Sequence, residues 1–147
     1  MAIQFSSGLR DHLLISGSFK SALDGGVLRI YTGAIPATAD ADSSGLTVLC
    51  TISLDATGTG ITWGSTVTAG ILSKNTAEIW RGLIGTTGTA TFFRFMAISD
   101  TGAASTTAKR VQGTMGLVGA DINFSNVNLV AGNYRVIGSL NVTLPMV

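Results

Sequence analysis

The sequence predicts an all-β fold: an antiparallel β-sandwich, jelly-roll-like, of about eight strands, with a short helical segment at the N-terminus. Three observations lead to this prediction. Strand-like segments recur at short spacing from Val27 onward, turns rich in glycine, serine and threonine separate them, and strands do not alternate with helices. A chain of 147 residues is long enough for one domain whose core needs neither disulfides nor metal.

Residues 1–26 are the one region with helix signals, and residues 27–147 form the predicted sandwich domain. The serine pair Ser6-Ser7 is placed to cap a first helix and Ser18 a second, while Gly25-Gly26 ends the segment. Helices this short are marginal alone, so they have to pack on something else. Two arrangements stay open: an arm that reaches a neighbouring subunit, and a plug on the chain's own sandwich.

From Val27 the pattern becomes that of strands. Between the first two strands, residues 34–45 form a loop by composition. The segments with strand patterns are, in chain order, Val27–Gly33, Leu46–Leu54, Ile61–Trp63, Val67–Leu72, Ala77–Ile84, Thr89–Ser99, Lys109–Met115, Asp121–Phe124 and Tyr134–Leu144.

The strand Thr89–Ser99 is predicted to lie in the middle of a sheet, because it is apolar on both faces. Phe93 and Phe95 point to one side, and Phe92 and Met96 point to the other. Such a strand has to be covered twice. The opposite sheet of the sandwich supplies one cover, and we expect the second to be another protein chain.

A candidate protein–protein interface follows from the strand before it. The turn Gly85–Gly88 predicts that Ala77–Ile84 and Thr89–Ser99 form a hairpin, with Trp80 opposite Phe93. Two arginines among apolar residues then share the other face, and arginine is enriched at protein interfaces. The predicted interface residues are Arg81, Phe92, Arg94 and Met96.

Composition favours a surface that is used in assembly. Charged residues make up 12% of the chain and hydrophobic residues 46%, whereas a typical domain has about 25% charged residues. The alternative is a β-protein surface rich in threonine. The net charge of +1 predicts no nucleic-acid or membrane-surface partner. We also expect no membrane span and no secretory signal, and we expect Cys50 to be a small buried hydrophobe.

Residues with the patterns of catalytic or metal sites are scarce. The chain has one histidine, His12, and one cysteine, and it contains no G-x-S-x-G motif. Asp40 and Asp42 lack the further oxygen ligands of a calcium loop. We therefore predict a protein that is not an enzyme and that has no cofactor and no metal. A sandwich that binds glycans on Trp63, Trp80 or Tyr134 is the alternative from another functional class.

Three stretches together resemble a known family. They are VLRIYTGAIPATADA at Val27–Ala41, FFRFMAISD at Phe92–Asp100 and RVQGTMGLVGADINF at Arg110–Phe124, followed by a last strand that ends in TLP. The chain resembles the small virion structural proteins of tailed bacteriophages, and among them most the capsid cement, or decoration, proteins of the podophage type.

This resemblance implies a jelly-roll or related sandwich on the outside of the capsid, made in the host cytoplasm. Its expected partners are the major capsid protein, whose neighbouring subunits it bridges and stabilises, and copies of itself in a dimer or trimer. The resemblance brings no catalytic residues with it. A tail, collar or head–tail connector protein is the alternative within the same class.

Overall fold

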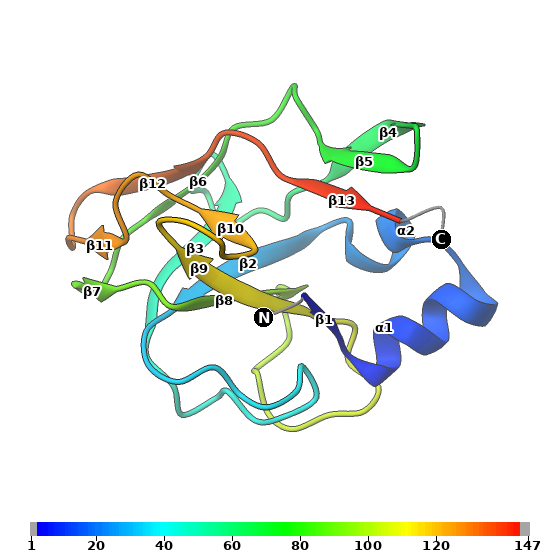
Figure 1. The fold of residues 1–147 in the computed structure, drawn as a ribbon, viewed down its shortest axis with the longest axis horizontal. Coiled ribbons are helices and arrows are strands. Elements are labelled where there is room, and N and C mark those ends of the chain that lie inside the picture. Colours follow the sequence, from blue (N-terminus) through cyan, green and yellow to red (C-terminus); the bar gives the residue numbers. More distant parts are fainter. Residues whose placement is uncertain (1–2, 145–147) are drawn as a thin grey trace.

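The structure, a computed structural model, describes residues 3–144 and confirms an antiparallel β-sandwich with short N-terminal helices (Figure 1). In chain order the elements are β1 (Gln4–Phe5), α1 (Ser7–Asp11), the π-helix η1 (His12–Ser16), α2 (Phe19–Leu23), β2 (Gly26–Tyr31), β3 (Val48–Leu54), β4 (Trp63–Thr68), β5 (Ile71–Lys74), β6 (Trp80–Leu83), β7 (Gly88–Thr89), β8 (Phe92–Ala97), β9 (Val111–Gly116), β10 (Ile122–Asn123), β11 (Asn128–Leu129), β12 (Tyr134–Ile137) and β13 (Asn141–Thr143).

The large sheet has the strand order β1-β9-β8-β2-β3-β6-β12, and β10 pairs with β9 outside this path. The β10–β9 pair is parallel, and the other pairs of this sheet are antiparallel. A second sheet has the order β13-β5-β4, and β7 pairs with β11. The sequence predicted fewer strands because several of these elements are only two or three residues long.

The large sheet curls around the hydrophobic core. Strands β6 and β8 are three positions apart in the sheet, which in a flat sheet would separate them by about 14 Å. The rings of Trp80 on β6 and Phe95 on β8 nevertheless lie 6.1 Å apart between their centroids. Trp63 from β4 sits 5.3 Å from Trp80 and 5.6 Å from Phe95, so the smaller sheet covers the open side of the curl.

The N-terminal segment packs on the chain's own sandwich, as in the plug arrangement. The side-chain oxygen of Ser6 accepts a hydrogen bond from the N–H of Leu9, and Ser18 caps α2 with a capping box. Leu9 and Leu23 are buried in the same core as the strands. Strand β1, which the sequence did not predict, pairs with β9. Residues 3–26 and 27–144 thus share one core.

The predicted hairpin is wrong. Strand β6 pairs with β3 and β12, whereas β8 pairs with β2 and β9. Pairing β8 with the six residues of β2 places Phe95 opposite Leu28 and Phe93 opposite Ile30 on the core face. The four-residue strand β6 offers less apolar surface for that position, and the long apolar strands therefore meet in the centre of the sheet.

Candidate interaction surfaces

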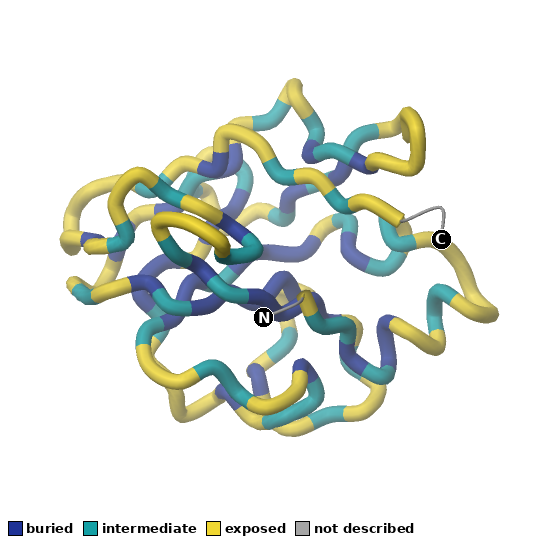
Figure 2. Tube along the Cα trace, viewed as in Figure 1, coloured by how far each residue is buried: buried dark blue, intermediate teal, exposed yellow. Residues whose placement is uncertain are grey.

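Three of the four predicted interface residues lie inside the protein. Phe92, Arg94 and Met96 are fully buried, so their side chains are not available to another chain, and the prediction is corrected at these positions. Figure 2 shows the central strands of the large sheet as a mainly buried stretch. The face that was expected to meet a second protein is covered by two loops of the same chain, residues 34–45 and 98–110.

Arg94 holds the first of these loops on the sheet. Its guanidinium donates to the carbonyls of Thr38 and Ala41 and to the hydroxyl of Ser43, at 2.9–3.1 Å. Its Nε donates to Oε1 of Gln112 on β9 at 2.6 Å. Burial and the nearby charge of Arg110 lower the pKa of Arg94. Two backbone carbonyls, a hydroxyl and a side-chain amide oxygen thus satisfy this buried charge.

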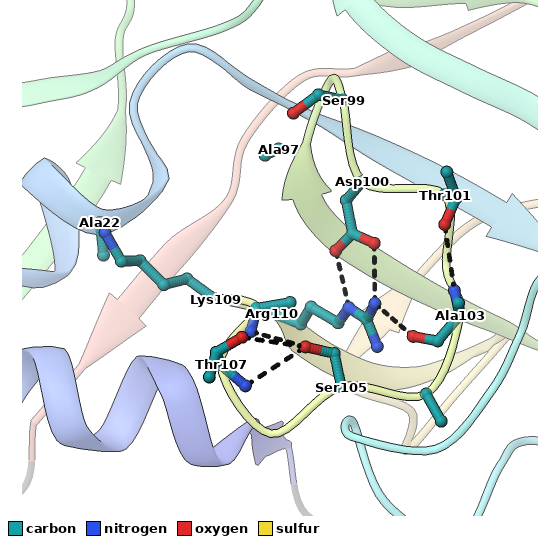
Figure 3. A pocket seen from close by; sticks show the side chains of 12 residues that line it. Ala22, Ala97, Ser99, Asp100, Thr101, Ala103, Ser105, Thr107, Lys109 and Arg110 are labelled. Atoms are coloured by element: carbon teal, nitrogen blue, oxygen red, sulfur yellow. Dashed lines mark hydrogen bonds and ion pairs between the residues drawn. The ribbon is translucent and has the colours of Figure 1, made fainter.

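Arg110 holds the second loop through a buried ion pair (Figure 3). Its Nε lies 2.7 Å from Oδ2 of Asp100, and the pair is almost completely buried. The same guanidinium donates to the carbonyls of Ala39 and Ala103. Burial alone would raise the pKa of Asp100, but the hydrogen bonds from Arg110 and from the N–H of Gly102 outweigh it and lower that pKa.

The cavity beside this ion pair measures about 490 Å³ and is also lined by Ser105, Thr107 and Lys109. All three guanidinium nitrogens of Arg110 already donate to oxygens of the protein. The carboxylate of Asp100 accepts from Arg110 and from Gly102. The pair is therefore engaged in holding the loop, and we assign it a structural role.

Arg81, the fourth predicted residue, lies on an exposed apolar surface. The register of β6 with β12 places Arg81 beside Val136 and Leu83 beside Tyr134 on the outer side of the sheet. These four residues are called the β6–β12 patch. Leu83, Tyr134 and Val136 are about half exposed. Arg81 stacks 4.7 Å from the ring centroid of Tyr134 and pairs with Asp55 at 2.7 Å. Strand β12 forms an edge of the large sheet.

A second apolar surface lies where the N-terminal helices meet the β4–β5 hairpin. A groove of about 590 Å³ runs between them, with mostly apolar walls. Its apolar lining residues are Phe5, Leu13, Phe19, Val67, Leu72, Val142 and Leu144. At its rim, the π-helix η1 exposes Leu14 by 82% and Ile15 by 91%. This region is called the helix–hairpin groove.

Neither surface was predicted as a surface from the sequence. The signal for the groove was the run Leu13-Leu14-Ile15, because three consecutive apolar residues cannot all lie on the inner face of a short helix. The signal for the patch was that Arg81 and Leu83 share one face of their strand, as Tyr134 and Val136 share one face of theirs. Both signals were present, but the wrong hairpin paired the strand of Arg81 with Thr89–Ser99 instead of with Tyr134–Leu144.

Most aromatic side chains lie in the interior. Trp63 and Trp80 are buried, and the ring nitrogen of Trp80 donates to Glu78 at 2.9 Å. Hydrogen bonds from Thr62 and Trp80 outweigh the burial that would raise the pKa of Glu78, and they lower it. Within the described residues, Tyr134 is the one aromatic residue classed as exposed. Two of the three predicted glycan-stacking residues are therefore unable to reach a ligand.

The single cysteine and the single histidine lie among residues that do not form a catalytic or metal site in the described part of the chain. Cys50 is buried, as expected, and this burial raises the pKa of its thiol to about 11, which keeps it protonated at neutral pH. His12 lies with Nε2 3.0 Å from the hydroxyl of Ser21. Over residues 3–144, no group of three or more histidine, cysteine or acidic side chains is arranged to hold a metal ion. In the same range, no helix has the length and apolar character to cross a membrane.

Comparisons of this chain with protein-family models, with curated proteins and with solved structures find no match.

Proposed function

We propose that the protein is a structural virion protein of a tailed bacteriophage, a capsid cement or decoration protein that bridges neighbouring major capsid subunits from the outside of the shell. The observation that carries the proposal is the presence of two separate apolar surfaces on one small domain. Figure 1 shows β6 and β12 toward one end of the long axis and the helices with β4 and β5 at the other. The sequence resemblance to cement proteins supports the same role.

Two separated contact surfaces are what a bridging protein needs. One end holds a capsid subunit, and the other holds a neighbouring subunit or a further copy of the chain. Burying an exposed aliphatic side chain at such a joint stabilises it by about 1.5–3 kcal/mol. Packaged DNA pushes outward on a shell held by noncovalent contacts, and many copies acting together add strength to its joints.

The proposed role is not catalytic and requires no cofactor. The charges fit contact with protein: the net charge is +1, and the arginines at positions 81, 94 and 110 are held by groups of the protein itself. This balance supports a partner that is neither nucleic acid nor membrane. A tail, collar or head–tail connector protein would use the same two surfaces at a different place in the virion.

A glycan-binding module is the competing function, and the burial of Trp63 and Trp80 weighs against it. Phage particles that lack this protein separate the two functions. If it is a cement protein, the heads lose their DNA at lower temperature while adsorption to host cells is unchanged. Heads of normal heat resistance that fail to adsorb would overturn the proposal and support glycan binding.

A variant of the β6–β12 patch tests the surface itself. Leu83 and Val136 are half exposed, so we expect the fold to tolerate aspartate at both positions, which circular dichroism checks. We expect L83D/V136D to bind particles that lack the protein at least tenfold more weakly than the unaltered chain. Ile98→Asp, at a residue of similar exposure outside the patch, is the matched control and should bind normally. Equal binding by all three proteins would exclude this patch as the capsid contact.

A further inference from the structure

We infer that the helix–hairpin groove is the site where two copies of this chain pair, with the Leu14-Ile15 turn of each copy inserted into the groove of the other. This inference makes specific a choice that the proposed function leaves open, namely that this end of the domain holds a further copy of the chain, and it can be tested without a capsid. It rests on the volume and polarity of the groove, the exposure of the turn and their placement next to each other.

The Leu14-Ile15 turn is an apolar projection. Both residues belong to the π-helix η1, whose wider turn directs them outward while their neighbour Leu13 lines the groove. Their exposed fractions, 82% and 91%, are among the highest of the large apolar side chains. Single π-helical turns are uncommon and are frequently found at functional sites. Covering two adjacent aliphatic side chains that are exposed to water is favourable, so a partner that covers them gains binding free energy.

The groove is an apolar recess without an occupant of its own among residues 3–144. The hairpin contributes Val67 and Leu72, the last strand contributes Val142, and Phe19 comes from α2. Lys20, a charged residue at its wall, is already bound to Asp24 and to the carbonyl of Trp63. A volume of about 590 Å³ exceeds that of two aliphatic side chains, so there is enough space for the turn.

The turn and the groove are adjacent, and this placement favours a second copy over an unrelated partner. Leu13 and Gly17, which flank the turn in sequence, both line the groove. A two-fold interface requires one surface to contain both a projection and its complement, since each copy then presents both to the other. Here one face contains both, and the small net charge of +1 per copy opposes pairing only weakly.

A stable dimer would cover only a small part of the surface of each copy. A standard interface buries about 800 Å² of each partner, which is roughly a tenth of the 7513 Å² that the described chain exposes. The face comprises η1, α2, the β4–β5 hairpin and β13. In addition to the turn, it carries the exposed residues Val67 and Leu144.

Complementary charge variants test the pairing directly. In L14K the projection becomes basic, and in V67E the groove wall becomes acidic; both positions are largely exposed, so the single chain folds normally. Sedimentation velocity is expected to show a dimer for the unaltered chain. For each variant alone we expect the dissociation constant of the dimer to rise about 100-fold or more, because two symmetry-related contacts are lost together.

A one-to-one mixture of the two variants should dimerise again, since the basic turn of the L14K chain then meets the acidic wall of the V67E chain. The second contact of that mixed dimer joins an unaltered turn to an unaltered groove.

Val118→Lys is the matched control, because Val118 is 90% exposed and lies outside the groove; it should dimerise like the unaltered chain. A chain that stays monomeric near millimolar concentration would overturn the inference. So would a dimer that L14K and V67E leave intact, or a mixture that does not recover. If the chain is monomeric and removal of residues 145–147 opens the groove to an apolar dye, its own C-terminus is the occupant. A dimer that does not bind capsids would contradict the proposed function and leave this inference standing.

Discussion

Arg94 and Arg110 determine which surface of the large sheet is available to partners. Both are fully buried, and both donate to backbone carbonyls of the loop at residues 34–45. A guanidinium presents five donors in a fixed planar arrangement, so one side chain can hold several carbonyls at once. The two arginines thereby let a loop of small residues cover a sheet face that would otherwise need a second protein.

Replacing Arg94 with lysine should destabilise the protein strongly despite the retained charge. An ammonium group has three donors and cannot reach Gln112, Ser43 and the two loop carbonyls together. Because buried acceptors are left without partners, we expect R94K to lower the free energy of unfolding by about 2–4 kcal/mol in urea titrations. Arg10→Lys, at an exposed arginine, should change it by less than about 0.5 kcal/mol. Equal losses in the free energy of unfolding for the two variants would refute the role of Arg94 in holding the loop.

The Asp100–Arg110 pair should give the protein a specific acid sensitivity. The pKa of Asp100 is lower in the folded protein than its ordinary value, which in an unfolded chain is about 3.9. The carboxylate therefore contributes stability above about pH 4, and this contribution is lost as the pH falls through the lowered pKa. We expect Asp100→Asn to cost about 3–5 kcal/mol at pH 7. The difference in the free energy of unfolding between the two proteins should shrink below about pH 4. A difference that does not change with pH would contradict a stabilising role for the ionised form of Asp100.

At the scale of elements, helix α1 illustrates how packing overrides local preference. A β-carbon at Gly8 would lie 2.2 Å from the carbonyl oxygen of Thr107, so only glycine lets α1 sit this close to the loop at residues 98–110. Helix propensity alone would make alanine better than glycine by about 1 kcal/mol. Here propensity and packing predict opposite signs.

We expect Gly8→Ala to lower the melting temperature, because the added methyl group pushes α1 away from the loop. A loss of about 1–3 kcal/mol in the free energy of unfolding is the expected size. Gly45→Ala is the control, since a β-carbon there meets nothing within 4 Å. Thermal unfolding followed by circular dichroism measures both. A stabilised G8A protein would show that α1 is free to move, and would contradict the close packing.

Local signals in the sequence predicted the helix caps and the central strand correctly. Ser6 and Ser18 form caps, and β8 is buried on both faces. These features depend on residues close together in the chain. Strand pairing depends on distant residues instead: Ile84 donates to the carbonyl of Asn133 and not to a residue of the predicted hairpin.

The covering loops could not be predicted from residue type. Residues 34–45 are mostly small or polar and carry little apolar signal, so the sequence marks them only as a loop. Their contribution is made by backbone carbonyls, which every residue possesses. The same limitation explains the wrong interface prediction for Arg94. Its acceptors include backbone carbonyls of a distant loop, which residue types do not reveal, so the sequence left Arg94 without an internal partner.

At the scale of the whole molecule, the two exposed apolar surfaces give the domain two ends. The β6–β12 patch and the helix–hairpin groove share no residue. If copies pair through the groove, each dimer presents two β6–β12 patches outward. Under the proposed function, such a dimer would join two capsid subunits with one kind of contact at each.

The position and copy number of the protein in a purified phage particle test the proposed function most directly. Electron cryomicroscopy of intact virions, together with quantitative mass spectrometry, would measure both. We expect many copies on the outer surface of the head, each over a joint between major capsid subunits, with Leu83 and Val136 in the contact. A few copies at one vertex or along the tail, or none in the virion, would contradict a cement protein.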